Sequence, residues 1–136
     1  MILADTSAWV EYDRATGSAV HQRMLQLIAE EGPLSVTEPV VMEVLAGARS
    51  DQRELDLRHL LLRFRLLRFD AAADFHAAAR IYRRCRAVGF TPRGMVDCMI
   101  AAVASRNGAS LLAQDTDLQR LGQIVGIELD QASPTI

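Results

Sequence analysis

Four acidic residues lie in places where a carboxylate is costly unless it has a partner. Asp5 and Asp115 each follow a short apolar run that predicts a buried strand. Glu43 and Asp97 each lie in an apolar helical segment that carries no other charge. An unpaired carboxylate in such surroundings is unfavourable. The residue types and their positions therefore suggest that the four side chains converge on one site.

A converging set of carboxylates needs a cation. At about 100° per residue, Glu43 and Asp97 lie about 60° from the edge of the apolar stripe of their helices, so both border the core. Acids that meet there cannot all stay ionised without a positive charge among them. Oxygen ligands with no His or Cys nearby favour Mg²⁺, with Mn²⁺ as a substitute. One or two such ions suit metal-dependent phosphoryl transfer, in which the metal activates water for an in-line displacement.

Each acid taken alone also fits a structural role. Asp5 could cap the helical turn that begins at Ser7, and Asp115 could cap the helix after its strand. Asp97 suits the first turn of a helix, where the helix dipole favours negative charge. Glu43 could be a solvated helix residue. Only the four positions together favour a shared site.

Short apolar strands alternate with helical segments along the chain, which predicts a parallel α/β sheet covered on both faces. In such sheets ligands bind beyond the carboxyl ends of the strands, which is where Asp5 and Asp115 lie. The strands are expected at 1–4, 34–36, 66–69, 110–113 and, as a possible fifth strand, 124–128. Helices are expected at 7–12, 18–30, 38–48, 52–64, 71–87, 95–106 and 115–121.

Length and composition narrow the classes of protein. The 136 residues, half of them apolar, fit one domain, residues 1–136. All 15 basic residues are Arg, so the chain has no Lys for a P-loop or a Schiff base. Cys85 and Cys98 have no metal-type spacing and are expected to be reduced, buried thiols. No secretory signal or apolar run of about 20 residues occurs, so we expect a cytoplasmic protein with no membrane association.

Four sequence blocks carry the acids in order. They are MILADTSAWV from Met1, EPVVMEVLAGA from Glu38, DCMIAAVA from Asp97 and QDTDL from Gln114. Together, over nearly the whole chain, they resemble the PIN-domain ribonucleases, specifically the VapC toxins of bacterial toxin–antitoxin pairs. The resemblance implies a PIN-like three-layer α/β fold, with a short parallel sheet of four to five strands flanked by helices.

The resemblance also assigns roles to residues. Asp117 is a further acid that could help to bind metal, and Ser7 is implied to hydrogen-bond and orient the carboxylates. Leu118 stands where an aromatic residue is common, which leaves open whether Asp115 or Asp117 is the direct ligand. The acids that the resemblance assigns to metal binding and catalysis are Asp5, Glu43, Asp97 and Asp115.

The implied activity is that of a toxin. The resemblance suggests a magnesium-dependent endoribonuclease that cuts structured RNA such as tRNA or ribosomal RNA. It also implies a cognate antitoxin as partner, and a homodimer or a hetero-oligomer with that antitoxin. A catalytically silent PIN-fold module that binds RNA or a partner is the alternative, although the presence of every acid favours the enzyme. A DNA-directed nuclease or a metal phosphatase stays open, but such a phosphatase would be expected to use a Lys that this chain lacks.

Local basic segments could contact RNA despite the net charge of −2. Residues 80–93 hold five Arg and no acid, and RNA phosphates need such a surface. Arg93, in the loop before Asp97, is the best candidate, followed by Arg80 and Arg84. Long Arg stems that cover apolar surface are the structural alternative. That alternative is preferred for residues 49–68, where three acids accompany six Arg.

Overall fold

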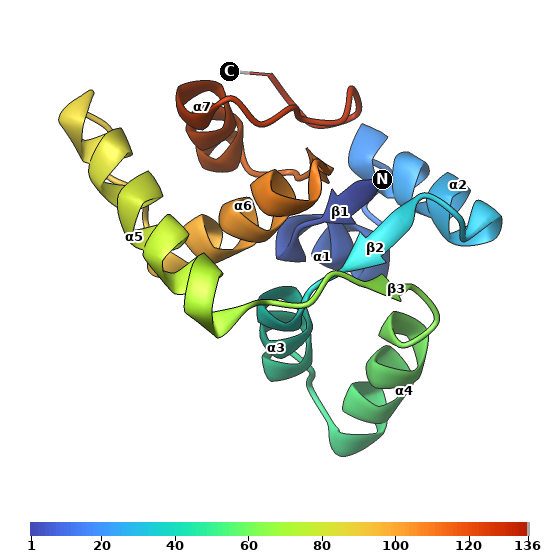
Figure 1. Cartoon of the computed structure of the whole chain (residues 1–136). Coiled ribbons are helices and arrows are strands. Elements are labelled where there is room, and N and C mark those ends of the chain that lie inside the picture. The colour runs from blue at the N-terminus through green and yellow to red at the C-terminus, as the bar shows by residue number, and fades with distance from the viewer. Residues whose placement is uncertain (136) are drawn as a thin grey trace.

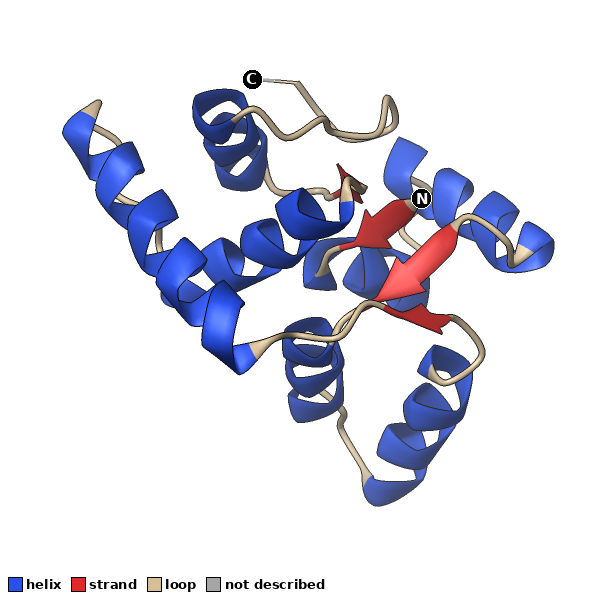
Figure 2. Ribbon diagram, viewed as in Figure 1, coloured by secondary structure: helices blue, strands red, loops and turns tan. Residues whose placement is uncertain are grey.

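Four short strands form one parallel sheet at the centre of the computed structural model, which describes residues 1–135 (Figure 2). The strands are β1 (Ile2–Ala4), β2 (Leu34–Val36), β3 (Arg65–Leu66) and β4 (Ser110–Leu112), in the spatial order β3-β2-β1-β4. Ile2 of β1 is paired with Leu34 on one side and with Ser110 on the other. The first and last strands of the chain are therefore neighbours.

Seven helices surround this sheet in the described part of the chain (Figure 1). The hairpin of α5 and α6 is the most extensive helix pair, and α3 packs against both α1 and α6. No helix of the described residues is long and apolar enough to cross a membrane. The helices are α1 (Thr6–Arg14), α2 (Ala19–Glu30), α3 (Glu38–Ala46), α4 (Asp51–Leu61), α5 (Ala71–Ala87), α6 (Met95–Asn107) and α7 (Thr116–Val125).

Side-chain caps define where most of the helices begin. A capping carboxylate or hydroxyl accepts a hydrogen bond from a backbone N–H of the first turn, which that turn cannot satisfy itself. Thr37 precedes α3 as expected but makes no such bond, and the Pro in the first turn of α3 fits a helix start. Residues that cap with their side chains are Asp5, Ser18, Ser50, Asp70 and Asp115.

The strands at 1–4, 34–36 and 110–113 are confirmed within a residue or two of the predicted limits. The third strand is shorter than predicted and begins one residue earlier, at Arg65. The possible fifth strand at 124–128 is wrong. Its first two residues are the last of α7, which ends at Gly126 in the left-handed conformation, with φ +79°. Leu129 alone then forms an isolated parallel bridge to Leu111.

The fifth strand fails because an apolar run was taken for a strand when its residues continue a helix. Leu118 and Leu121 are buried, and Ile124 follows them at helical spacing and packs against the same core. The chain then returns so closely that a Cβ on Gly122 would lie 2.5 Å from the Leu129 side chain. Helix α7 therefore packs on the core, and the returning segment at Leu129 meets the β4 edge through a single bridge.

The core lies between the sheet and the helices that pack on it. Leu3 of β1, Ile100 of α6 and Leu111 of β4 are fully buried. Cys85 and Cys98 are free and buried, as the sequence predicted. Burial raises the pKa of the Cys98 thiol to about 11.

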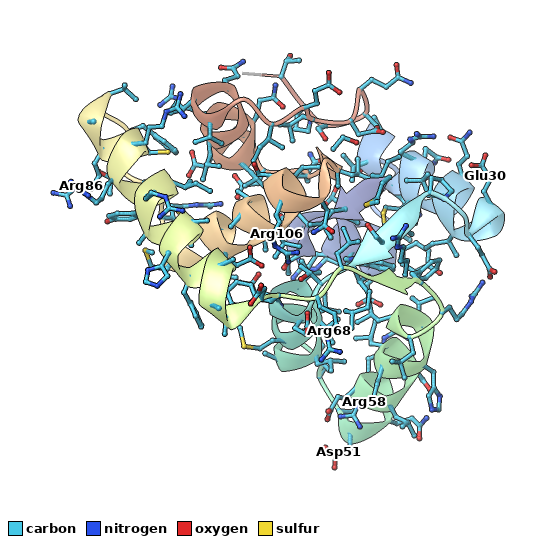
Figure 3. All side chains as sticks on the ribbon, viewed as in Figure 1. Glu30, Asp51, Arg58, Arg68, Arg86 and Arg106 are labelled. Carbon is cyan, nitrogen blue, oxygen red and sulfur yellow. The ribbon has the colours of Figure 1, made fainter. Side chains whose placement is uncertain are left out.

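An ion pair between an exposed Arg and a buried Asp joins α5 to α6. Arg106 donates hydrogen bonds of 2.9 and 2.8 Å to the two carboxylate oxygens of Asp74, which is 1% exposed. The same guanidinium donates to the carbonyl oxygen of Arg68, 2.6 Å away, on the segment that leads into α5 (Figure 3). Burial raises the pKa of Asp74, but hydrogen bonds from Arg106 and from Asp70 N–H outweigh burial and hold it below the ordinary value.

We predict that Asp74→Ala destabilises the protein by about 1–3 kcal/mol, because Arg106 loses a charge-assisted hydrogen-bond partner. Since the pKa of Asp74 is lowered on folding, this contribution is present above the ordinary aspartate pKa of 3.8 and is lost as the pH falls further. Urea unfolding at pH 7 measures the difference. The exposed Asp56→Ala is the control and should change stability by less than about 0.5 kcal/mol. Equal effects of the two variants would contradict the prediction.

Candidate active site

A pocket of about 530 Å³ opens where β1 and β4 end. It receives side chains from the starts of α1 and α6, from the middle of α3 and from the segment after β4. All four acids predicted as a cluster line this pocket, although they come from sequence positions far apart. The lining residues are Asp5, Thr6, Ser7, Val10, Glu11, Glu43, Arg93, Asp97, Gln114, Asp115 and Thr116.

Asp5 is held in place by Ser7. The backbone N–H and the hydroxyl of Ser7 donate to Oδ2 of Asp5 at 3.1 and 2.7 Å. Ser7 Oγ in turn accepts from the backbone N–H of Gln114 at 2.9 Å, which connects the start of α1 to the end of β4. Oδ1 of Asp5 is buried without a hydrogen-bond partner, and the whole residue is 3% exposed. A buried carboxylate oxygen left open in this way suits a cation.

Glu43 has a partner that the sequence did not reveal. The Thr6 hydroxyl donates a hydrogen bond of 2.6 Å to Oε1 of Glu43. Thr6 lies directly between Asp5 and Ser7, so two adjacent hydroxyl residues orient two different acids. The Thr-Ser pair after the first acid is the signal that could have indicated this role. Glu11, one turn further along α1, is a fifth carboxylate of the lining that sequence reasoning also missed.

Without a cation, the surroundings of the pocket disfavour the ionised form of its carboxylates. Burial raises the pKa of Asp97 to about 7, and the negative charges of Asp5, Asp115 and Glu43 act in the same direction. The guanidinium of Arg93 opposes them. Burial also raises the pKa of Asp5, despite the hydrogen bonds from Ser7. The mutual repulsion expected from the sequence is therefore present in the fold.

Arg93 lies among these acids. Its guanidinium pairs with Asp115 and, through Nε at 2.9 Å, with Oδ2 of Asp117. Asp115 lines the pocket, whereas Asp117 is not part of the lining and meets the site through Arg93. Arg93 side-chain atoms are 64% exposed, so the guanidinium can exchange the acids for another anion without unpacking the core.

The donor set fits a hard divalent cation. No three His, Cys, Asp or Glu side chains of residues 1–135 are arranged so that they could hold one ion directly. Mg²⁺ does not require that arrangement, because it keeps several waters and binds through one or two carboxylates. The unpartnered Oδ1 of Asp5 and the acids around it provide such ligands.

Arg80 and Arg84 are not brought to the acids. They line a different cavity of about 510 Å³ between α5 and α6, and this cavity shares no lining residue with the carboxylate pocket. Of the three Arg predicted to bind RNA, only Arg93 lies at the pocket.

We predict that Asp97→Asn stabilises the metal-free protein at pH 8 by about 1–2 kcal/mol. Because the pKa of Asp97 rises on folding to about 7, the folded protein binds more protons than the unfolded chain between about pH 4 and 7. Wild-type stability in EDTA should therefore fall as the pH rises through this range, and Asp97→Asn should remove most of the decline.

Thermal unfolding in EDTA from pH 5 to 8 measures this effect, with the exposed Asp51→Asn as control. If the stability of the wild type and of Asp97→Asn changed with pH in parallel, the raised pKa of Asp97 would not be the cause of the decline.

Comparison with known proteins identifies the family. The model of the family described as PIN domain matches residues 2–124. The chain is 43% identical over 129 residues to Ribonuclease VapC11 of Mycobacterium tuberculosis, which covers 94% of this chain and 96% of that protein.

Solved structures show the same fold at lower identity. VapBC2 from Rickettsia felis, bound to a promoter DNA fragment, has a TM-score of 0.76 at 18% identity over 96% of this chain and 98% of the other. Mycobacterium tuberculosis VapC20, described as a Sarcin-Ricin loop cleaving toxin, has a TM-score of 0.68 at 22% identity over 90% and 95%. The sheet order, the carboxylate pocket and these matches lead to one assignment: the chain belongs to the VapC ribonucleases of the PIN-domain family.

Proposed function

We propose that this chain is the toxin of a toxin–antitoxin pair and acts as a metal-dependent endoribonuclease. The observation that carries the proposal is the pocket in which four separate elements bring Asp5, Glu43, Asp97 and Asp115 together, with one buried oxygen of Asp5 left without a partner. Its 43% identity to a protein named Ribonuclease VapC11 supports RNA as the substrate. A single domain, residues 1–136, carries the activity in the cytoplasm.

Some residues of the pocket bind the cation, and others position the residues that bind it. When bound, Mg²⁺ supplies a Lewis acid that activates water and offsets the charge that develops on the phosphate. One or two of the four acids would bind the cation directly and the others would contact its waters, while Ser7 and Thr6 fix the orientation of Asp5 and Glu43. Because no 2′-hydroxyl attack is needed, the products carry 5′-phosphate ends. Mn²⁺ can substitute for Mg²⁺, and both one-ion and two-ion sites suit these acids.

Arg93 has two successive partners in this proposal. Without a cation it neutralises Asp115 and Asp117. If Asp115 held the cation, Arg93 would no longer be needed to neutralise it, and its exposed guanidinium would be available for an RNA phosphate at the mouth of the pocket. Asp115 is the direct ligand, whereas Asp117 acts through Arg93. Arg80 and Arg84 provide a second phosphate contact for the more distant part of the RNA.

The proposed substrate and partners are supported by the similarity of this chain to VapC toxins and VapBC pairs. The substrate is a structured RNA such as tRNA or ribosomal RNA. VapC20, which shares the fold, is described as a toxin that cleaves the Sarcin-Ricin loop. The protein partner is a cognate antitoxin, consistent with the VapBC pair of Rickettsia felis. The toxin forms a homodimer, alone or within the hetero-oligomer with its antitoxin.

Cleavage of total cellular RNA tests the proposal. Purified, antitoxin-free protein should make discrete cuts in Mg²⁺ or Mn²⁺ and none in EDTA, and sequencing of the 5′ ends locates them. Asp5→Asn and Asp97→Asn should each lower the rate at least about 100-fold, because they remove metal-binding oxygens. Asp51 does not line the pocket, so Asp51→Asn should cut like the wild type.

Three outcomes would contradict this function. A folded wild-type protein that cuts no RNA in any divalent metal would support the silent binding module instead. Preferred cleavage of single-stranded DNA or of a chromogenic phosphate ester would indicate another nuclease or a phosphatase. Full activity in Asp97→Asn would remove the carboxylate pocket from the mechanism.

The hydroxyls that orient the acids give a separate prediction. Thr6→Val and Ser7→Ala should each lower cleavage and Mn²⁺ affinity by about 10–100-fold while the fold is kept, since each removes a hydrogen bond that positions a metal-binding carboxylate. Titration with Mn²⁺ measures the affinity independently of cleavage. The exposed Thr91→Val is the control. Unchanged Mn²⁺ affinity in both Thr6→Val and Ser7→Ala would show that the two hydroxyls do not position the metal ligands.

A further inference from the structure

A second cavity, of about 570 Å³, adjoins the carboxylate pocket between α1, α3 and α4. The two share Val10 and Glu43 in their linings, so a molecule in the second cavity lies beside whatever binds the acids. Its volume is within the range of roughly 300–1,000 Å³ that is usual for ligand sites. The lining residues that the argument uses are Trp9, Arg14, Val44, Arg49, Arg53 and Leu57.

Trp9, one of the residues that line this cavity, carries a buried donor without an acceptor in the described part of the chain. Trp9 is 2% exposed, and its ring packs against Phe64 at 5.7 Å and edge-on against Tyr12 at 6.3 Å between ring centroids. Its indole Nε1 is buried and has no acceptor among the described residues. A buried N–H without a partner is unfavourable, so an acceptor on a bound molecule would improve the site. Val44 and Leu57, both buried, add apolar surface around it.

The rim of the cavity carries free positive charge. Arg53 is paired with Asp13. Arg14 and Arg49 are exposed and form no ion pair with any residue that the structure describes. Two unpaired guanidinium groups beside an apolar wall match a ligand that has both a phosphate and an aromatic ring. The sequence-based interpretation of residues 49–68 as solvated surface did not foresee this place for Arg49.

We propose that this cavity binds one nucleotide of the RNA substrate, adjacent to the phosphate that is cleaved. Its phosphate lies between Arg14 and Arg49, and its base lies against the wall formed by Trp9, Val44 and Leu57 and accepts a hydrogen bond from Trp9 Nε1. The inference rests on the proposed function, because the neighbouring nucleotide is the one whose phosphate enters the carboxylate pocket. RNA is favoured over a protein segment by the two unpaired Arg and by the continuity of the two cavities through Val10 and Glu43.

Salt-dependent RNA binding tests the proposal without cleavage. The probe is a short fluorescein-labelled single-stranded RNA of mixed sequence, and its anisotropy is measured in EDTA over a series of NaCl concentrations. Each phosphate contact contributes about 0.7 to the slope of the logarithm of the affinity against the logarithm of the salt concentration. Because Arg14 and Arg49 contact the same phosphate in this proposal, replacing both by Gln should lower the slope by about 0.7.

The charge-matched control replaces Arg65 and Arg68 by Gln. Both Arg are exposed and line neither cavity, and this variant should keep the wild-type slope. Trp9→Phe keeps an aromatic ring but removes the N–H, and it should weaken binding about 3–10-fold with the slope unchanged. Thermal unfolding verifies that each variant is folded at the assay temperature.

Equal slopes for the Arg14→Gln/Arg49→Gln variant and the control would overturn the proposal and leave a protein segment as the candidate occupant. Weaker binding without a change of slope in Arg14→Gln/Arg49→Gln would overturn it as well, because no phosphate contact would have been lost. Wild-type protein that binds RNA through Arg14 and Arg49 but cuts none in Mg²⁺ would support this site and contradict the proposed function. Normal cutting by the wild type, together with equal slopes for Arg14→Gln/Arg49→Gln and the control, would support the proposed function and contradict this site.

Discussion

The repulsion among carboxylates in one half-buried pocket is the constraint on which the rest of this structure depends. Four acids from four elements meet at the end of a small sheet, and burial together with the negative charges of the other acids raises the pKa of Asp97 to about 7. The fold tolerates this because hydroxyls hold Asp5 and Glu43 by hydrogen bonds and Arg93 pairs with Asp115. Each of these contacts compensates a charge that the apolar surroundings would otherwise exclude.

The structural and functional explanations of the acids turn out to be compatible. Asp5 and Asp115 do cap α1 and α7, through hydrogen bonds to the N–H groups of Ser7 and Asp117. In each case one carboxylate oxygen makes the cap. The other oxygen pairs with Arg93 in Asp115 and has no hydrogen-bond partner among residues 1–135 in Asp5. The helix start thus fixes the direction of the acid, and the same hydrogen bond anchors the helix and aims the free oxygen into the pocket.

The sequence was sufficient to predict an element or a site residue wherever one local pattern determined it. Strand 34–36 and helix 71–87 have the predicted limits, because an apolar run or a capping Asp is bounded by clear stop signals. Asp5, Glu43, Asp97 and Asp115 could be grouped because each was the lone charge of an apolar segment or followed a strand. The failures depend on contacts between distant segments: Thr6 with Glu43, Arg93 with Asp115, and the return of the chain at Leu129 that closes this edge without a fifth strand. No spacing within one segment reveals which distant residue a side chain will meet.

The order of the strands also controls when activity can arise during synthesis. β1 and β4 are neighbours in the sheet, so the pocket around Asp5 can form only after β4, which begins at Ser110, has been synthesised. A chain still emerging from the ribosome therefore lacks Asp115 and the backbone N–H of Gln114 that steadies Ser7. Such long-range closure is slow compared with helix formation. The carboxylate pocket is therefore incomplete in any fragment that ends before β4.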